Sequence, residues 1–179
     1  MSSSSGYKVV TTCSPKNFAL VESYGAEKAF DYHSPTCGED IRAYTKNSLE
    51  YVLDIITEAK TIRQSYAAIG RGGGKYVGFE LLPQELIATM RKAVKSDWVM
   101  GVEMTGVEIK LPGEYYRAES PELRAWGCAW IRRFEALYNA GKIRPHPIKL
   151  NTGGLKEVIG GIGEMQRREV YAQKLVYTL

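Results

Sequence analysis

Four neighbouring residues near the start of the chain could bind an anion. They are Ser14, Pro15, Lys16 and Asn17. They offer a hydroxyl, an ammonium group and an amide at the beginning of an expected helix, where backbone N–H groups also point outward. The stretch between Gly6 and Val21 contains no Asp or Glu, although dinucleotide folds that bind a ribose 2′-hydroxyl use an acid for that contact. These residue types therefore suit a ribose 2′-phosphate.

The elements expected around these residues are a strand, a tight turn and a helix. Residues 9–12 are all β-branched and suit a buried strand. Pro15, with a serine cap before it, fits the first turn of a helix that should end at Gly25. Open α/β sheets place their ligands at such turns, after the carboxyl end of a parallel strand. An ordinary Ser-Pro helix start beside a solvated lysine fits the same residues, so both interpretations stay open.

Composition and charge describe one soluble globular chain. Its 179 residues are enough for a sizeable core. The 24 basic and 20 acidic residues are interspersed, and the formal net charge is +4. The basic pair Arg132-Arg133 lies beside Trp130 and Phe134 on an expected helix, and a solvated helix face explains it. We therefore expect no nucleic-acid partner.

Cysteine, histidine and hydropathy patterns exclude further classes. The cysteines are Cys13, Cys37 and Cys128. They have no paired spacing, which indicates a reducing compartment and no zinc site. His33 and His146 stand alone, so we assign neither to catalysis nor to a metal. No apolar run has the length of a membrane span, and residues 1–6 lack the apolar core of a signal peptide. The sequence thus predicts a cytoplasmic protein without metal or membrane contact.

Strands and helices are expected to alternate along the first half. Strands are expected at residues 28–31, 49–56 and 75–79, and helices at residues 38–45 and 58–69. Residues 49–56 form a nearly continuous apolar run, typical of a strand buried on both faces. The alternation predicts the α/β class, with a parallel sheet and right-handed crossovers.

Two features of this half suggest chemistry but have simpler explanations. The glycine-rich run at residues 70–75 lacks the spacing of a phosphate loop, and it precedes a strand instead of a helix. A flexible helix-to-strand turn explains it. Asp54 falls within a buried strand, where an unpaired carboxylate is costly. We expect it to cap or orient backbone near the ligand crevice and not to perform acid-base chemistry.

The second half alternates less regularly. A helix-like stretch is expected within residues 80–94, a bulky apolar strand at 97–104 and an excursion loop at 111–121. A long helix should span residues 121–139 and direct its large apolar side chains inward. Those side chains are Leu123, Trp126, Trp130, Phe134 and Leu137. A strand at 146–150, a helix at 154–169 and a strand at 174–179 should complete the chain.

Several stretches together make the chain resemble the C-terminal half of a medium-chain dehydrogenase/reductase. Within that superfamily it is similar to the stand-alone, trans-acting enoyl reductases that serve fungal polyketide synthases, of the lovastatin type. The stretches that carry the resemblance are residues 6–17, 25–35, 44–47, 51–54, 67–71, 97–98, 146–154 and 174–176. Each is weak alone, but as a set they are specific and cover nearly the whole chain.

The resemblance implies an NADPH-dependent reduction of an α,β-unsaturated thioester on the acyl carrier protein of a polyketide synthase. By matching positions, the Ser14 to Asn17 turn would hold the 2′-phosphate of NADPH. Tyr32 would lie on the adenine-ribose side, and Phe79 and Glu80 would flank the nicotinamide half. The acyl pocket would be lined by Val99, Met100, Gly101, Val102 and Glu103. The resemblance also implies the zinc-free branch of the superfamily.

The sequence departs from a complete member of this family before residue 7. There the family has an N-terminal domain, a first sheet strand and a glycine-rich phosphate turn. That strand is central in the order 3-2-1-4-5-6. We therefore expect a Rossmann-like parallel sheet that lacks its central strand, with unpaired edges near Tyr7 and Leu49 through which the chain could self-associate. The expected domains are a partial NADP-binding domain at 1–141 and, at 142–179, a C-terminal segment of the catalytic, GroES-like domain.

Two functions of different classes follow from this departure. The first is a trans-acting enoyl reductase that keeps its NADPH contacts and works alone or with a second chain. The second is a non-catalytic remnant, a binding or scaffold module derived from the same family. Hydride transfer needs the nicotinamide close to the alkene, and half of a cleft is poorly suited to that. The catalytic residues stay unassigned.

Overall fold

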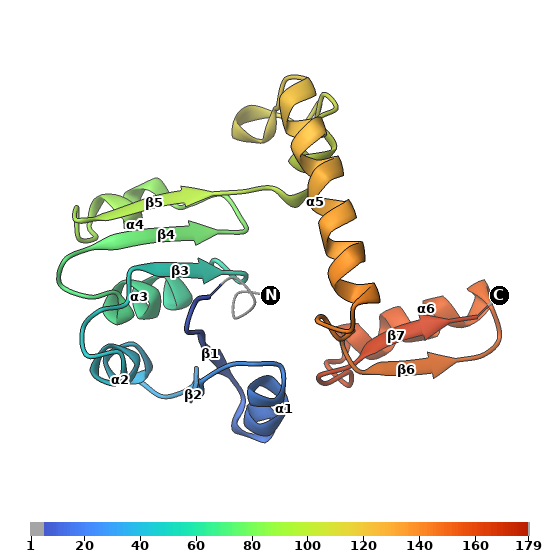
Figure 1. Cartoon of the computed structure of the whole chain (residues 1–179), viewed down its shortest axis with the longest axis horizontal. Coiled ribbons are helices and arrows are strands. Elements are labelled where there is room, and N and C mark those ends of the chain that lie inside the picture. The colour runs from blue at the N-terminus through green and yellow to red at the C-terminus, as the bar shows by residue number, and fades with distance from the viewer. Residues whose placement is uncertain (1–5, 179) are drawn as a thin grey trace. The chain divides into compact units, whose positions relative to one another are not determined.

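The computed structural model describes residues 6–178, which form two compact units, residues 6–136 and 137–178 (Figure 1). The boundary lies inside α5 (Pro121–Asn139), a few residues before the predicted end of the first domain. The domain identities proposed from the sequence stay predictions, so each unit is described by itself.

The first unit contains the predicted alternation of strands and helices. In chain order it has β1 (Val10–Cys13), η2 (Pro15–Asn17), α1 (Phe18–Ser23), β2 (Lys28–Asp31), α2 (Cys37–Tyr44), β3 (Tyr51–Asp54), α3 (Ala59–Ala68), β4 (Gly74–Gly78), α4 (Gln84–Ala88) and β5 (Val94–Trp98). Two 3-10 turns, η3 (Gly101–Thr105) and η4 (Gly113–Tyr115), lie between β5 and α5. The predicted α/β class is confirmed.

The strand pairs of this unit are all parallel, but they form two sheets. β1 pairs with β2, with Val10 beside Lys28. β3, β4 and β5 form the second sheet, with Tyr51 beside Lys75 and Lys75 beside Lys95. Among residues 6–178, β1 and β3 each have a strand on one side only. This confirms the predicted parallel sheet without its central strand, and it leaves one unpaired edge on each of these strands.

Two apolar clusters hold the helices to the strands. The larger cluster is Ile62, Tyr66, Ile69, Tyr76, Leu82 and Val94, from α3, β4, β5 and the loop after β4. The smaller is Cys37, Ile41 and Ala68, with Val10 and Phe30 packed against it. α2 and α3 can approach closely because Gly38 has no side chain, since a Cβ there would lie 2.5 Å from the carbonyl oxygen of Gln64. These contacts fix the strand ends that carry the candidate site.

The run at residues 49–56 is not buried on both faces, contrary to expectation. The strand is only four residues long, and its alternate side chains Val52 and Asp54 face the core. Tyr51 and Leu53 point to the opposite face and are 56% and 61% exposed. Helices cover a single face of this strand within residues 6–178. The apolar run therefore marks one buried face and one open apolar face.

Asp54 caps the turn after β3, as predicted. Its Oδ1 accepts the backbone N–H groups of Ile56 and Thr57, each at 3.0 Å, and its Oδ2 accepts the Tyr76 hydroxyl at 2.9 Å. The Thr57 hydroxyl in turn accepts the N–H of Phe79 at 2.9 Å. One buried carboxylate therefore joins the ends of β3 and β4 next to the site.

Asp54→Asn is expected to lower the free energy of unfolding by about 1.5–3 kcal/mol, because it removes a buried charge that accepts several hydrogen bonds. Burial, and then the bond to Asp54, raise the pKa of Tyr76 above its usual value. The unfolded chain therefore loses this proton at a lower pH than the folded chain, so stability should fall as the pH rises above about 10.

Urea unfolding between pH 7 and pH 11 tests both statements. Tyr76→Phe should flatten the alkaline loss of stability, whereas the matched control Tyr51→Phe, on an exposed tyrosine of the neighbouring strand, should not. In a double-mutant cycle, Asp54→Asn and Tyr76→Phe should be non-additive. Simple additivity would show that the pair does not contribute as a unit.

β5 ends earlier than the strand expected at residues 97–104. It spans Val94–Trp98, and Met100 then leads into η3. β4 ends at Gly78, the register partner of Trp98. A longer β5 would have no neighbour to pair with, so the bulky apolar run after Trp98 turns into a short helix instead.

α5 has the predicted bounds, and its predicted inward face is partly covered, because Leu123, Trp130 and Leu137 are half-buried. Trp126 and Phe134 are exposed, and Trp126 stacks with Trp130 at a centroid distance of 6.1 Å. The packed side is set by Gly127, where a Cβ would lie 2.1 Å from the carbonyl oxygen of Met104. Gly127 lies on the same helix face as Leu123 and Trp130, four residues after the first and three before the second, so this close backbone approach falls on the predicted inward face.

The second unit contains β6 (Ile148–Asn151), α6 (Leu155–Gln166) and β7 (Lys174–Tyr177). β6 and β7 are parallel, with Ile148 beside Lys174, so the strand, helix and strand expected here are confirmed with shorter ends. Gly161 of α6 lies against Tyr177. Four apolar side chains of α6 are exposed: Leu155, Ile159, Ile162 and Met165. Among residues 6–178, no helix combines the length and apolar character that crossing a membrane requires.

Candidate nucleotide and acyl site

The predicted binding residues of the first unit all follow the carboxyl ends of its strands. Ser14 follows β1, Tyr32 follows β2, Phe79 follows β4 and Val99 follows β5. Within each of the two sheets, the parallel strands present their carboxyl ends at one edge, which is where α/β proteins bind ligands. Ser14 and Tyr32 follow neighbouring strands of one sheet, and Phe79 and Val99 follow neighbouring strands of the other.

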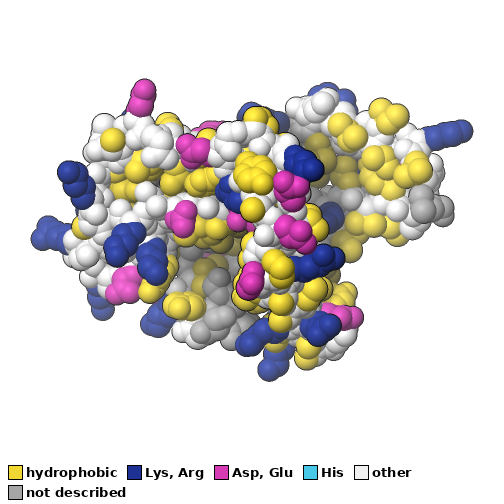
Figure 2. Space-filling view, turned by 90° about the horizontal axis from the view of Figure 1, so that it is seen from above, with side chains coloured by type: hydrophobic (Ala, Val, Ile, Leu, Met, Phe, Trp, Pro, Cys, Tyr) yellow, Lys and Arg dark blue, Asp and Glu magenta, His cyan; other side chains and the backbone are white. Residues whose placement is uncertain are grey.

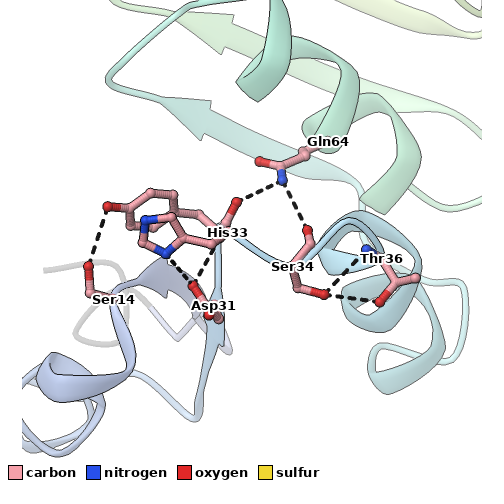
Figure 3. A network of polar contacts seen from close by, with 7 residues as sticks. Ser14, Asp31, His33, Ser34, Thr36 and Gln64 are labelled. Atoms are coloured by element: carbon pink, nitrogen blue, oxygen red, sulfur yellow. Dashed lines mark hydrogen bonds and ion pairs between the residues drawn. The ribbon is translucent and has the colours of Figure 1, made fainter.

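Ser14 lies next to Tyr32. Its Oγ is 3.3 Å from the Tyr32 hydroxyl oxygen. Figure 3 labels Ser14 and marks its polar contact with a dashed line. Ser14 has the extended backbone of a helix cap, and its carbonyl accepts the N–H of Asn17 at 2.8 Å. Its side chain makes no capping bond. The backbone therefore has the geometry of a Ser-Pro helix start, while the Ser14 hydroxyl faces Tyr32, which is also a predicted binding residue.

The turn after β2 is held by residues that the sequence analysis did not assign. The backbone N–H of His33 donates to Asp31 Oδ1 at 2.9 Å, and His33 Nδ1 lies 2.8 Å from the same oxygen (Figure 3). The backbone bond from His33 is the first cause of the lowered pKa of Asp31. The rings of Tyr32 and His33 have a centroid distance of 4.0 Å. The Asp-x-His spacing across a strand end was the available signal.

Gln64 ties this turn to α3. Its Nε2 donates to the carbonyl oxygen of Tyr32 at 3.0 Å and to that of Ser34 at 3.5 Å (Figure 3). The Gln64 side chain therefore links α3, which packs against β3, to the turn after β2, by donating hydrogen bonds to two backbone carbonyl oxygens of that turn. Tyr32 is consequently fixed from both sides, by Gln64 at its backbone and by His33 at its ring.

Glu80 and Glu103 take part in contacts that anchor the excursion loop. The Tyr115 hydroxyl donates to Glu80 Oε1, and this bond is the first cause of the lowered pKa of Glu80 and of the raised pKa of Tyr115. Arg117 Nε donates to Glu103 Oε1 at 2.7 Å, and its guanidinium carbon lies 4.7 Å from the ring centroid of Trp98. Glu103 therefore holds the loop, a role that its assignment to the acyl pocket did not foresee.

The remaining predicted acyl residues form an open apolar surface. Val99 and Val102 are 40% and 54% exposed, Gly101 is exposed and Met100 is half-buried. Phe79 is half exposed at the end of the neighbouring strand. This surface could pack against an acyl chain on one side. The roles of these residues, and of the seven residues predicted to bind the cofactor, stay predictions.

The described residues offer little to a metal ion. Within residues 6–178 no three His, Cys, Asp or Glu side chains are close enough together to hold one. The cysteine nearest the site, Cys13, has a raised pKa because of burial and the neighbouring Asp31 and Glu22.

The sequence closely matches curated fungal proteins. It is 70% identical over 175 residues to trans-enoyl reductase pydC of an Acremonium species, covering 98% of this chain and 49% of the relative. It is 69% identical to trans-enoyl reductase gkaC of Penicillium citrinum, covering 98% and 48%. The chain is homologous to the trans-enoyl reductases. It spans about half the length of the curated relatives that it matches. No protein-family profile matches it.

Solved structures show the same fold. The CurF ER cyclopropanase from the curacin A biosynthetic pathway superposes with a TM-score of 0.69 at 17% identity, covering 97% of this chain and 47% of that one. The CurK enoyl reductase gives a TM-score of 0.69 at 18% identity with the same coverage. The resemblance to a medium-chain dehydrogenase/reductase, stated above from the sequence, is therefore confirmed at the level of fold.

Proposed function

We propose that this chain provides the nucleotide-binding part of a trans-enoyl reductase, which reduces an α,β-unsaturated acyl thioester on the carrier protein of a polyketide synthase. The observation that carries the proposal is the 70% identity to a trans-enoyl reductase along 98% of the chain. We place the protein in the cytoplasm, with the synthase as its partner. The oxidoreductase class and the cofactor follow from the family.

NADPH fits the residues at the end of β1. The turn from Ser14 to Asn17 contains a hydroxyl, an ammonium group and an amide, and no acid occurs between Gly6 and Val21. The Ser14 hydroxyl is not used for capping and faces Tyr32. These residues would hold the 2′-phosphate and its ribose, while Phe79 and Glu80 would lie beside the nicotinamide half. When bound, NADPH would supply the hydride that saturates the alkene.

The acyl chain would lie against the open apolar surface after β5. Val99, Met100 and Val102 offer apolar contacts to a flexible chain, and Arg117 holds the segment by its bond to Glu103. The chain's own residues would therefore bind and orient the two reactants. The exposure of Phe79, Val99 and Val102 means that, within residues 6–178, only one wall of such a pocket is present.

A non-catalytic binding or scaffold module is the second candidate. The specific observation in its favour is the open acyl surface, where Phe79, Val99 and Val102 are about half exposed. Such a module would keep the nucleotide site or the partner contacts without turnover. The two candidates are separated by the assays described in the Discussion.

The cofactor assignment predicts a preference for NADPH over NADH. A charge-assisted hydrogen bond is worth about 1.5–3 kcal/mol, so the 2′-phosphate should improve affinity at least about tenfold. Lys16→Ala should remove most of that preference. Lys28→Ala is the matched control, because Lys28 is also exposed but starts β2, at the opposite edge of the same sheet. Fluorescence titration with both cofactors measures the difference, and equal affinities would contradict the assignment of this turn.

A further inference from the structure

A basic hollow lies at the edge of the fold opposite the nucleotide site. It is lined by Glu39, Arg42, Ala43, Lys46, Asn47 and Arg71 and has a volume of about 400 Å³. Asn47 precedes β3 and Arg71 precedes β4, so the hollow is at the amino ends of these strands. The residues from Ser14 to Glu80 that are predicted to bind NADPH lie at the carboxyl ends. The hollow is therefore a separate feature, and the proposed reductase function does not use it.

A strained connection presents these residues in one arrangement. Lys46 and Asn47 both have positive φ, 53° and 63°, which is uncommon outside glycine. Asn47 Oδ1 accepts the backbone N–H of Arg71 at 3.0 Å, so the loop after α2 is joined to the turn before β4. Gly70 permits this approach, because a Cβ there would lie 2.3 Å from the carbonyl oxygen of Asn47. Backbone strain of this kind gathers at functional sites.

The three cations of the hollow are not neutralised within the described residues. No carboxylate of residues 6–178 lies within 4.0 Å of the charged nitrogens of Arg42, Lys46 or Arg71 in an ion pair. Arg42 donates to the carbonyl oxygen of Tyr66 at 3.4 Å, and its Nε is buried without a hydrogen-bond partner. Such a group in a native fold needs an explanation, of which a bound ion is one. Glu39 is the only acid in the lining.

Helix electrostatics explain only part of this charge. Arg42 and Lys46 stand at the C-terminal end of α2, where cations stabilise a helix. Arg71 is not on α2, yet its backbone is bonded to the same loop. Figure 2 shows several Lys and Arg side chains at the left end of the view, the end from which β3, β4 and β5 start in Figure 1.

A further arginine near the hollow is already engaged by backbone carbonyl groups. The neighbouring Arg91 directs its two terminal nitrogens at the carbonyl oxygens of Ile69 and Gly70, at 3.2 and 2.7 Å. It is therefore occupied in bracing the turn. Two guanidinium groups and one ammonium group around a hollow of this volume suit a compact dianion better than an extended acidic peptide, which needs a line of cations.

We infer that Arg42, Lys46 and Arg71 form a binding site for a phosphate group carried by a small ligand. The guanidinium forks and the ammonium group donate hydrogen bonds to the phosphate oxygens. The site is built at the amino edge of the sheet from α2, the loop that follows it and the turn before β4. Binding requires neither NADPH nor an acyl thioester.

Titration of the whole chain with inorganic phosphate tests this site by isothermal calorimetry and by chemical-shift changes of backbone amides. Saturable binding should move the amides around Asn47 and Arg71. Arg71→Gln and Lys46→Gln should each weaken it at least about tenfold. Both side chains are exposed, and the bond to Asn47 uses the Arg71 backbone, so the fold should survive. An amide spectrum of each variant checks this.

Three control measurements make the outcome decisive. Lys92→Gln, an exposed lysine before β5, should leave binding unchanged. Lys16→Ala, in the nucleotide turn, should also leave it unchanged, which separates this site from the proposed cofactor site. Loss of binding in either control, or its survival in Arg71→Gln, would overturn the assignment. So would a hexaglutamate peptide that binds this hollow more tightly than phosphate, because the site would then recognise an acidic protein segment.

Discussion

The purified 179-residue chain is expected to oxidise NADPH with a crotonyl or longer enoyl thioester at least about 100 times more slowly than full-length pydC. The reason lies in positioning. Correct orientation of two reactants lowers the activation free energy by about 7–11 kcal/mol. Losing about 2.7 kcal/mol of that slows the reaction by a factor of about 100. The acyl surface of this chain is open: Phe79, Val99 and Val102 are about half exposed, so within residues 6–178 nothing holds the thioester from the other side.

Absorbance at 340 nm measures this reaction, first with the chain alone and then with the partner synthase added. A third reaction contains the part of pydC that this chain does not match, supplied as a second polypeptide. Recovery of turnover only in that reaction would support a reductase that needs a second chain. Turnover near that of pydC by the chain alone would contradict the expectation. No turnover in any reaction, while NADPH still binds, would support the non-catalytic module.

A matched pair of variants shows whether any turnover uses the proposed surface. Val102→Lys places a charge on the apolar surface and should raise KM for a long acyl chain more than for a crotonyl group. Val107→Lys changes a similarly exposed valine beyond η3, outside the predicted acyl residues, and should leave KM unchanged. An equal response to both substitutions would separate the activity from this surface.

The order of strands and helices could be predicted because local patterns determine it. The β-branched run before Ser14, the Ser-Pro turn and the closing Gly25 are signals within a few residues, and the structure has β1, η2 and α1 there. The long helix after Pro121 was predicted with its observed bounds for the same reason. The placement of Ser14 with Tyr32, and of Phe79 with Val99, at the carboxyl ends of paired strands followed from parallel topology alone.

Features that depend on distant partners could not be predicted. The open face of β3 was missed because apolar spacing cannot say whether a helix covers each side. The exposure of Trp126 and Phe134 on α5 was missed, because apolar spacing does not show how much of a helix face other elements cover. Asp31, His33, Gln64 and Arg117 were not assigned, since a hydrogen bond between side chains from different elements leaves little trace in sequence. Only the Asp-x-His spacing could have been noticed.

The exposed apolar surfaces predict that the isolated chain associates. Leu53 of β3 is 61% exposed and Ile159 of α6 is 76% exposed, and the stripe of α6 repeats at spacings of three and four residues. Large contiguous apolar surfaces are rare on monomers. The unpaired edges of β1 and β3 can also accept a strand from another chain. We therefore expect dimers or larger species at micromolar concentrations, and a low melting temperature for any monomer.

Sedimentation velocity over a concentration series, combined with thermal melting, tests this expectation. Burial of one aliphatic side chain contributes about 1.5–3 kcal/mol, so Ile159→Glu should weaken association through α6 by at least about tenfold. Leu53→Lys should do the same if the open face of β3 is the surface involved. Lys156→Glu, on the same helix but outside the apolar stripe, is the control for added acid. A cooperative, high-melting monomer at every concentration would contradict the prediction, because the unpaired edges and the α6 stripe would then need no partner. Weakening by Leu53→Lys alone would place the contact on the sheet, and weakening by Ile159→Glu alone would place it on α6, since the two variants change different compact units.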